Sequence, residues 1–157
     1  MTSSELALKP QRLSPFYHKQ ASLGAKFIQD QFDWTRPERF SDPNDEKIKT
    51  ERSIGIYDIS HLIKLSVKGT KTLETVAALY NQPVSIGALL VNGPGLFKEA
   101  ICAILSKDEA IFITNPSHSE AVTQQLNTRA GKYQTLDVSP VLGGLYWVGR
   151  GGRFCRS

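Results

Sequence analysis

The stretch Ser53-Ile-Gly-Ile-Tyr-Asp-Ile-Ser-His-Leu-Ile-Lys-Leu-Ser-Val-Lys-Gly69 joins a charged segment to a run of alternating apolar and polar residues. Near its start, Gly55 fits the left-handed residue that commonly ends a helix. The second half of the stretch has the period-2 pattern of a half-buried strand. We therefore predict a helix that stops at Gly55 and a strand over residues 59–67, with a short polar joint between them.

Three polar side chains fall in this joint, namely Asp58, Ser60 and His61. Two interpretations fit them. Asp and Ser side chains commonly stabilise turns through hydrogen bonds to nearby backbone, and the local chemistry favours this interpretation. The joint between a helix end and a strand is also a place where a scaffold presents a binding or catalytic site.

The length and the amino-acid composition predict one folded domain over residues 1–157. The chain is 40% hydrophobic and 22% charged, which argues against disorder. Its longest apolar runs are strand-sized, whereas a membrane span needs about 20 apolar residues. The first ten residues lack the basic start and apolar core of a secretory signal, so we expect a cytoplasmic protein with no membrane partner.

The net charge of +4 and the pI near 9.1 raise the question of nucleic-acid binding. The basic residues are scattered, however, and much of the excess lies at Arg150, Arg153 and Arg156. The chain contains no basic and aromatic ribonucleoprotein motif, so we expect no nucleic-acid partner.

The residue types that hold zinc are sparse. Cys102 and Cys155 make neither a disulfide framework nor a metal-binding pair. His18, His61 and His118 lie far apart, without the Cys or carboxylate spacing of a zinc site. We expect no metal.

Capping signals predict three helices. Asp42-Pro43 opens the first, Thr70 is the expected N-cap of the second, and Asn115-Pro116 opens the third. The expected helices cover residues 43–54, 71–82 and 116–130.

Apolar runs and turn signals between these helices predict several short strands, and Arg36-Pro37 is expected to break the chain. The expected strands cover residues 23–28, 59–67, 86–91, 96–105, 110–114, 133–138 and 142–148. Hairpins are frequent, so we predict an α+β fold with an antiparallel or mixed sheet and helices on one face. Residues 150–157 are expected to form a flexible tail.

Several segments in register resemble a known family. They are Leu23-Gly-Ala-Lys-Phe27, Trp34-Thr-Arg-Pro-Glu-Arg-Phe40, residues 51–69, Ile111-Phe-Ile-Thr-Asn115 and residues 136–149. Together they resemble the start of the tetrahydrofolate-binding aminomethyltransferase family, which includes the T-protein of the glycine cleavage system. The Trp-x-Arg-Pro form and Lys64 are closer to the folate domains of sarcosine oxidase and dimethylglycine dehydrogenase.

This resemblance implies a chemistry and a set of site residues. Family members form 5,10-methylenetetrahydrofolate from an aminomethyl or N-methyl-derived carrier, with the folate in a central cavity. The resemblance therefore implies tetrahydrofolate as the cofactor. It implies a cofactor-binding role for Asp58, Ser60, His61, Leu62 and Asn115.

The chain departs from the family pattern at the carboxylate that supports the reaction. The family's motif reads Gly-Gly-hydrophobic-x-Asp-Asp/Glu, whereas this chain reads Gly95-Leu-Phe-Lys-Glu99. This alignment puts Lys98 at the catalytic position, and a lysine has the opposite charge. Glu99, one residue further on, could supply the carboxylate instead. In a strand, however, its side chain would point to the face opposite that of residue 98. We therefore expect that the catalytic carboxylate is lost.

A second departure concerns length. Family members continue beyond a Gly-Pro pair where this chain has Gly149-Arg150, and the continuation holds further folate contacts. The resemblance thus implies a truncated or degenerate folate domain, which binds folate weakly or needs a protein partner or a second copy to complete it. The alternative function is a non-catalytic assembly module of a larger folate-dependent oxidase or demethylase complex. A third option is the family branch that assists iron–sulfur cluster repair.

Overall fold

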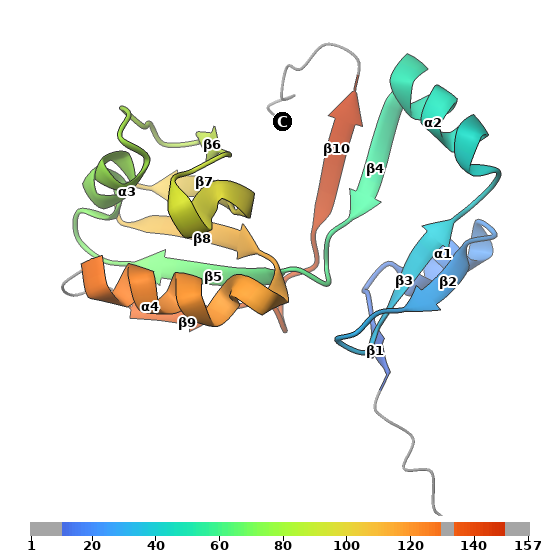
Figure 1. The fold of residues 1–157 in the computed structure, drawn as a ribbon, viewed down its shortest axis with the longest axis horizontal. Helices are drawn as coiled ribbons and strands as arrows, with labels where there is room; N and C mark the ends of the chain where they lie inside the picture. Colours follow the sequence, from blue (N-terminus) through green and yellow to red (C-terminus); the bar gives the residue numbers. More distant parts are fainter. Residues whose placement is uncertain (1–10, 130–133, 150–157) are drawn as a thin grey trace, which may run out of the picture. The chain divides into compact units, whose positions relative to one another are not determined.

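The computed structural model describes residues 11–129 and 134–149, which fall into two compact units (Figure 1). Unit 1 contains the described residues up to His61 and from Gly143 onward, and unit 2 is the segment Leu62–Leu142. No helix in the described part of the chain is long and apolar enough to cross a membrane. The predicted tail over residues 150–157 lies outside the described residues.

Unit 1 contains two small sheets. The first has the strand order β1-β3-β2, with β1 parallel and β2 antiparallel to β3. The second pairs β4 with β10 in antiparallel register, as Figure 1 shows for the two long arrows beside α2. The elements of unit 1 are β1 (Arg12–Leu13), α1 (Tyr17–Ser22), β2 (Lys26–Gln29), β3 (Trp34–Arg39), α2 (Pro43–Arg52), β4 (Ile54–Asp58) and β10 (Leu145–Gly149).

The chain does not break at Arg36-Pro37, so that prediction was wrong. Strand β3 runs through both residues, and Pro37 lies opposite Phe27 of β2. On its other side β3 pairs with β1 only at Trp34 and Thr35. A proline is tolerated there because β3 is an edge strand at that point and the missing N–H leaves no ladder bond unmade.

Helix α2 begins as predicted, because the Asp42 side chain accepts hydrogen bonds from the backbone N–H groups of Asn44 (2.9 Å) and Asp45 (3.4 Å). It ends at Arg52, with Ser53 as its C-cap. Gly55 is therefore not the helix-ending residue but a buried position inside β4. An ideal Cβ on Gly55 would lie 2.6 Å from Cγ2 of Thr50. Glycine is required there for the close approach of strand and helix, not for a left-handed turn.

Unit 2 is a five-stranded sheet with the order β6-β7-β8-β5-β9, in which every neighbouring pair is antiparallel. One face of this sheet packs against α3, α4 and η1 around the fully buried rings of Phe97 and Phe112. The predicted α+β class with helices on one face is confirmed. The elements of unit 2 are β5 (Ile63–Lys68), α3 (Thr72–Tyr80), β6 (Leu89–Leu90), η1 (Gly95–Glu99), β7 (Ile101–Ser106), β8 (Glu109–Thr114), η2 (Pro116–His118), α4 (Ser119–Arg129) and β9 (Gln134–Asp137).

Several predicted bounds in unit 2 were wrong in detail, and the strand expected over residues 59–67 begins only at Ile63. The predicted strand over residues 96–105 begins only at Ile101, because residues 95–99 form the 3₁₀ helix η1. The N-cap position of α3 is Lys71, not Thr70, and its backbone is left-handed with φ of 72°. The strand expected over residues 86–91 shortens to Leu89–Leu90.

Strand β5 is buried on both faces, whereas the sequence pattern predicted a strand with one buried face. It is flanked by β8 on one side and by β9 on the other. Lys64 and Ser66 are buried as fully as Leu65 and Val67, so both faces of the strand are covered. The Lys64 ammonium donates a hydrogen bond of 2.8 Å to the carbonyl oxygen of Leu62.

Candidate functional site

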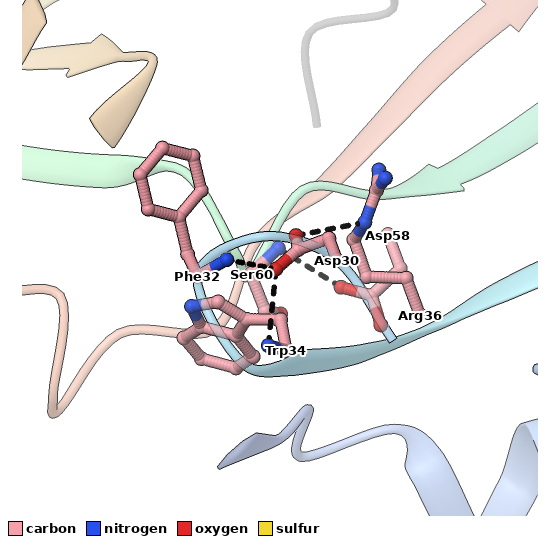
Figure 2. Close-up of polar contacts among 6 residues, drawn as sticks. All are labelled: Asp30, Phe32, Trp34, Arg36, Asp58 and Ser60. Carbon is pink, nitrogen blue, oxygen red and sulfur yellow. Dashed lines mark hydrogen bonds and ion pairs between the residues drawn. The ribbon is translucent and has the colours of Figure 1, made fainter. Parts of the chain in front are cut away.

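The carboxylate of Asp58 lies at the centre of a polar cluster in unit 1. Its Oδ2 accepts hydrogen bonds from the Ser14 hydroxyl and from the Gln20 amide at 2.7 Å. Its Oδ1 accepts a bond of 2.9 Å from the backbone N–H of Ser60, which Figure 2 shows as a dashed line. We call Ser14, Gln20, Asp58 and Ser60 the Asp58 cluster.

Ser60 connects this cluster to the segment that precedes β10. Its buried hydroxyl accepts a hydrogen bond of 3.2 Å from the backbone N–H of Gly144. The neighbouring backbone is tied as well, because the N–H of Ile59 donates to the Gly144 carbonyl at 2.9 Å. The cluster therefore holds the ends of β4 and β10 together, in addition to the strand ladder.

Burial and hydrogen bonding shift the pKa of Asp58 in opposite directions. Partial burial by itself raises the pKa of this carboxyl, because it disfavours the charged form. The hydrogen bonds from Ser14, Ser60 and Gln20 stabilise the carboxylate, and together they outweigh the burial. The pKa of Asp58 is therefore lowered, and the group is an anion engaged by several donors rather than a proton donor.

A second carboxylate, Asp30, organises the turn between β2 and β3. Its Oδ1 accepts from the backbone N–H groups of Phe32 (2.8 Å) and Trp34 (3.1 Å). Its Oδ2 lies 3.0 Å from Nε of Arg36, so the arginine of the Trp-x-Arg-Pro segment is paired within its own hairpin (Figure 2). This arginine thus has a local structural role.

A separate group of polar residues gathers in unit 2, at the ends of η1 and β8. Asn115 follows β8, and its Oδ1 accepts from the backbone N–H (3.0 Å) and the hydroxyl (2.9 Å) of Ser117. Glu99 ends η1, and its Oε2 lies 3.7 Å from Nδ1 of His118. Lys98 and Glu99 are both exposed.

The predicted site residues are thus divided between the two units. Asp58, Ser60 and His61 belong to unit 1, whereas Leu62 and Asn115 belong to unit 2. Asp58 and Ser60 are in direct contact, and both His61 and Leu62 are half-buried. Within the described ranges, no three His, Cys, Asp or Glu side chains are arranged to hold a metal ion.

Sequence reasoning missed Ser14 and Gln20 as partners of Asp58. They precede it by 44 and 38 positions, and no local signal in the sequence links them to it. The Asp58–Ser60 bond spans two positions and follows the Asx-turn pattern, so it was predictable.

Comparison with known families identifies the chain. The family model described as "GCVT N-terminal domain" matches residues 16–149, which covers both units. The chain belongs to this family. The family resemblance inferred from residues 23–69, 111–115 and 136–149 is thereby confirmed.

Individual members of this aminomethyltransferase family are distant and longer. The aminomethyltransferase of Thermotoga neapolitana is 23% identical over 76% of this chain and 35% of its own length. That of Leptospira interrogans is 28% identical over 72% of this chain and 33% of its own length. The chain therefore spans about a third of the length of these relatives.

A solved structure agrees on the fold. The glycine cleavage system aminomethyltransferase T from Bartonella henselae matches with a TM-score of 0.63 and 22% identity. The match covers 90% of this chain and 41% of the other.

Proposed function

We propose that the chain is a tetrahydrofolate-binding domain that serves aminomethyl transfer in one-carbon metabolism. The observation that carries this proposal is the family match over residues 16–149. The chain spans about a third of its relatives' length, and a good ligand site buries most of its ligand. We therefore expect weak binding by this chain alone.

Within this proposal, Asn115 contacts the pterin directly. Its side-chain oxygen already accepts two hydrogen bonds from Ser117. The amide nitrogen of Asn115 is then the group that offers hydrogen bonds to a ligand. The Asp58 cluster has a different role, because its carboxylate is engaged by donors of its own unit. We propose that it supports the backbone of the Asp58-x-Ser-His segment.

For the reaction, we assign the candidate carboxylate to Glu99. The strand argument against Glu99 no longer applies, because residues 95–99 form a 3₁₀ helix. Successive side chains of such a helix are about 120° apart rather than on opposite faces. Lys98 lies beside it, and the imidazole of His118 lies 3.7 Å from the Glu99 carboxylate.

Binding is tested by titrating the purified chain with tetrahydrofolate while recording thermal unfolding and tryptophan fluorescence. A ligand that binds the folded state alone raises stability by about 2.7 kcal/mol at 100 times its dissociation constant. We expect a saturable increase in Tm at millimolar tetrahydrofolate. The absence of any shift at that concentration rejects binding by the chain on its own.

Asn115→Asp is the sharpest variant for this test. It keeps the oxygen that caps η2 and replaces the amide nitrogen by a second oxygen. We expect the Tm without ligand to change little and the tetrahydrofolate shift to disappear. Ser117→Ala is the matched control, because it removes a partner of the same cap and keeps the Asn115 amide.

The role of Glu99 is tested by formation of methylenetetrahydrofolate from an aminomethyl carrier, once binding is shown. We expect Glu99→Gln to abolish turnover without weakening binding more than threefold. Normal turnover by Glu99→Gln would exclude Glu99 as the catalytic carboxylate, and turnover that first appears in Lys98→Asp would assign the carboxylate to position 98.

A second candidate is a non-catalytic assembly module. The observation that favours it is the set of exposed apolar side chains on β4 and β10. A chain of this kind shows no tetrahydrofolate-dependent shift and associates with a protein partner.

A further inference from the structure

The dipeptide Asn92-Gly93 lies in the connection between β6 and the 3₁₀ helix η1 of unit 2. Of the five asparagines in the sequence, Asn92 alone is followed by a glycine. Asn92 is exposed, and its backbone is left-handed with φ of 56°. Apart from glycine, asparagine and aspartate adopt this conformation most readily. The turn therefore restricts position 92 to a small set of residue types that includes asparagine.

Position 93 is restricted for a different reason. Gly93 is buried, and an ideal Cβ on it would lie 2.8 Å from Cε1 of Tyr80 and 2.8 Å from Cβ of Phe97. Phe97 is fully buried in the core of unit 2, and close-packed cores do not yield space for an added methyl group without strain. The fold thus requires a glycine directly after Asn92.

This pair of residues is open to a reaction within the chain itself. Because glycine has no Cβ, its backbone nitrogen approaches the preceding side chain with little hindrance. The Gly93 nitrogen forms a bond to Cγ of Asn92, and the bond from Cγ to the side-chain nitrogen breaks. The side-chain nitrogen leaves as ammonia with the proton of the Gly93 N–H, and a cyclic succinimide remains. Water then opens the ring at one of its two carbonyl carbons, which gives aspartate or isoaspartate.

The folded turn opposes the first step of this reaction. The Gly93 N–H donates a hydrogen bond of 3.1 Å to the carbonyl oxygen of Phe97. Gly93 also packs closely against the ring of Tyr80. A bonded and packed N–H neither loses its proton nor moves toward Cγ of Asn92 until the surrounding structure opens. Ring closure therefore requires local opening of the connection between β6 and η1.

We propose that Asn92 is a site of spontaneous deamidation, which the folded turn slows and which local opening of the turn permits. The two products differ in their effect on unit 2. Aspartate leaves the backbone unchanged and also tolerates a left-handed conformation. Isoaspartate adds a carbon atom to the main chain before Gly93, which displaces Gly93 from its close packing on Tyr80 and Phe97. This inference goes beyond tetrahydrofolate binding and is independent of it.

The test is incubation of the purified chain at mildly alkaline pH, followed by proteolysis and mass spectrometry of the peptides that contain asparagine. Asn44 is the internal control, because it is also exposed but is followed by Asp45. In guanidinium chloride we expect Asn92 to be converted at least tenfold faster than Asn44. In native buffer the conversion of Asn92 should be at least tenfold slower than in denaturant and still exceed that of Asn44.

Each result bears on a separate part of the proposal. Conversion of Asn92 no faster than that of Asn44 overturns the assignment of the site. Equal rates for Asn92 in buffer and in denaturant overturn the protection by the fold. Asn92→Gly keeps a residue suited to positive φ and lacks the side-chain amide, so its peptide should show no conversion and its Tm should stay close to that of wild type.

The effect of the modification is measured on the separated products. Chromatography isolates the isoaspartate chain, which an isoaspartate-specific methyltransferase identifies. We expect this chain to unfold at a lower temperature than the unmodified chain. Asn92→Asp reproduces the other product, and its Tm should stay within about 2 °C of wild type. An isoaspartate chain as stable as Asn92→Asp overturns the displacement of Gly93.

Discussion

The side-chain amide of Gln20 donates a hydrogen bond of 2.7 Å to the carboxylate of Asp58, 38 positions further along the chain. Gln20 is buried in helix α1, and Asp58 ends strand β4. The bond therefore joins helix α1 to the end of strand β4 within unit 1. It also stabilises the charged form of Asp58.

Gln20→Ala should lower the free energy of unfolding by about 1 kcal/mol. Losing a hydrogen bond to a charged group costs about 1.5–3 kcal/mol. The cost is reduced here because the Oε1 of Gln20 is buried without a partner among the described residues, and the substitution removes this unsatisfied oxygen. Urea unfolding measures the change. Gln31→Ala, at an exposed position, should stay within about 0.5 kcal/mol of wild type.

Stability should fall in acid partly through Asp58. The pKa of this carboxyl is lower in the folded chain than in the unfolded chain, so the unfolded chain binds more protons as the pH falls. The contribution is complete above the unfolded pKa, which is about 3.9 for an aspartate, and is lost as the pH falls through the lowered folded value.

Asp58→Asn should therefore flatten the pH dependence of urea unfolding over this window. Glu46 contributes in the same direction, because hydrogen bonds from the backbone of Ser41 and Phe40 lower its pKa, so Glu46→Gln has to be measured in parallel. Equal slopes for wild type and Asp58→Asn would show that this carboxyl is not linked to folding.

Gly55→Ala should destabilise unit 1 by about 1–3 kcal/mol, which is typical of overpacking. The added methyl group would lie 2.6 Å from Cγ2 and 3.2 Å from Oγ1 of Thr50. Thr50→Ala removes both atoms, so the double variant should recover most of the loss. Thermal unfolding of the wild type, the two single variants and the double variant gives the coupling energy between the two positions. If the two single changes in stability simply add in the double variant, the contact is contradicted.

The thiol of Cys102 should be unreactive in the folded chain. Burial raises its pKa to about 12, and its side chain lies in the core of unit 2. In a Cys155→Ser variant, labelling by a thiol reagent should be at least about 100-fold slower in buffer than in denaturant. Rapid labelling under native conditions would show that unit 2 opens readily.

Local signals account for the features that the sequence predicted. Asp42 before Pro43, the hairpin around Lys107 and Asp108, and Asn115 before Pro116 each depend on residues within a few positions. Their structure is determined by capping and turn chemistry, which a sequence displays directly.

Strand β4 was missed because its pairing is remote. Its partner β10 lies more than 80 positions away, and Gly55 was interpreted as a helix end for lack of any local sign of the contact with Thr50. The predicted strand over residues 96–105 began too early because a 3₁₀ helix as short as η1 has no distinct periodicity in the sequence.

In the candidate site, too, the local contact was predicted from the sequence and the remote contacts were missed. The contact between Asp58 and Ser60 follows from their spacing, and the family resemblance added Asn115. Ser14 and Gln20 had no such signal, because their contacts with Asp58 depend on the tertiary structure.

The connectivity of the two units has a consequence for the order of events during synthesis. Unit 2 is continuous, whereas unit 1 needs residues from both sides of it. The backbone of Lys64 binds Val138 (2.9 Å) and the hydroxyl of Ser139 (2.8 Å), so a folded unit 2 brings its own two ends together. We expect unit 2 to form first on the ribosome and to convert the remote pairing of β4 with β10 into the closure of a short loop.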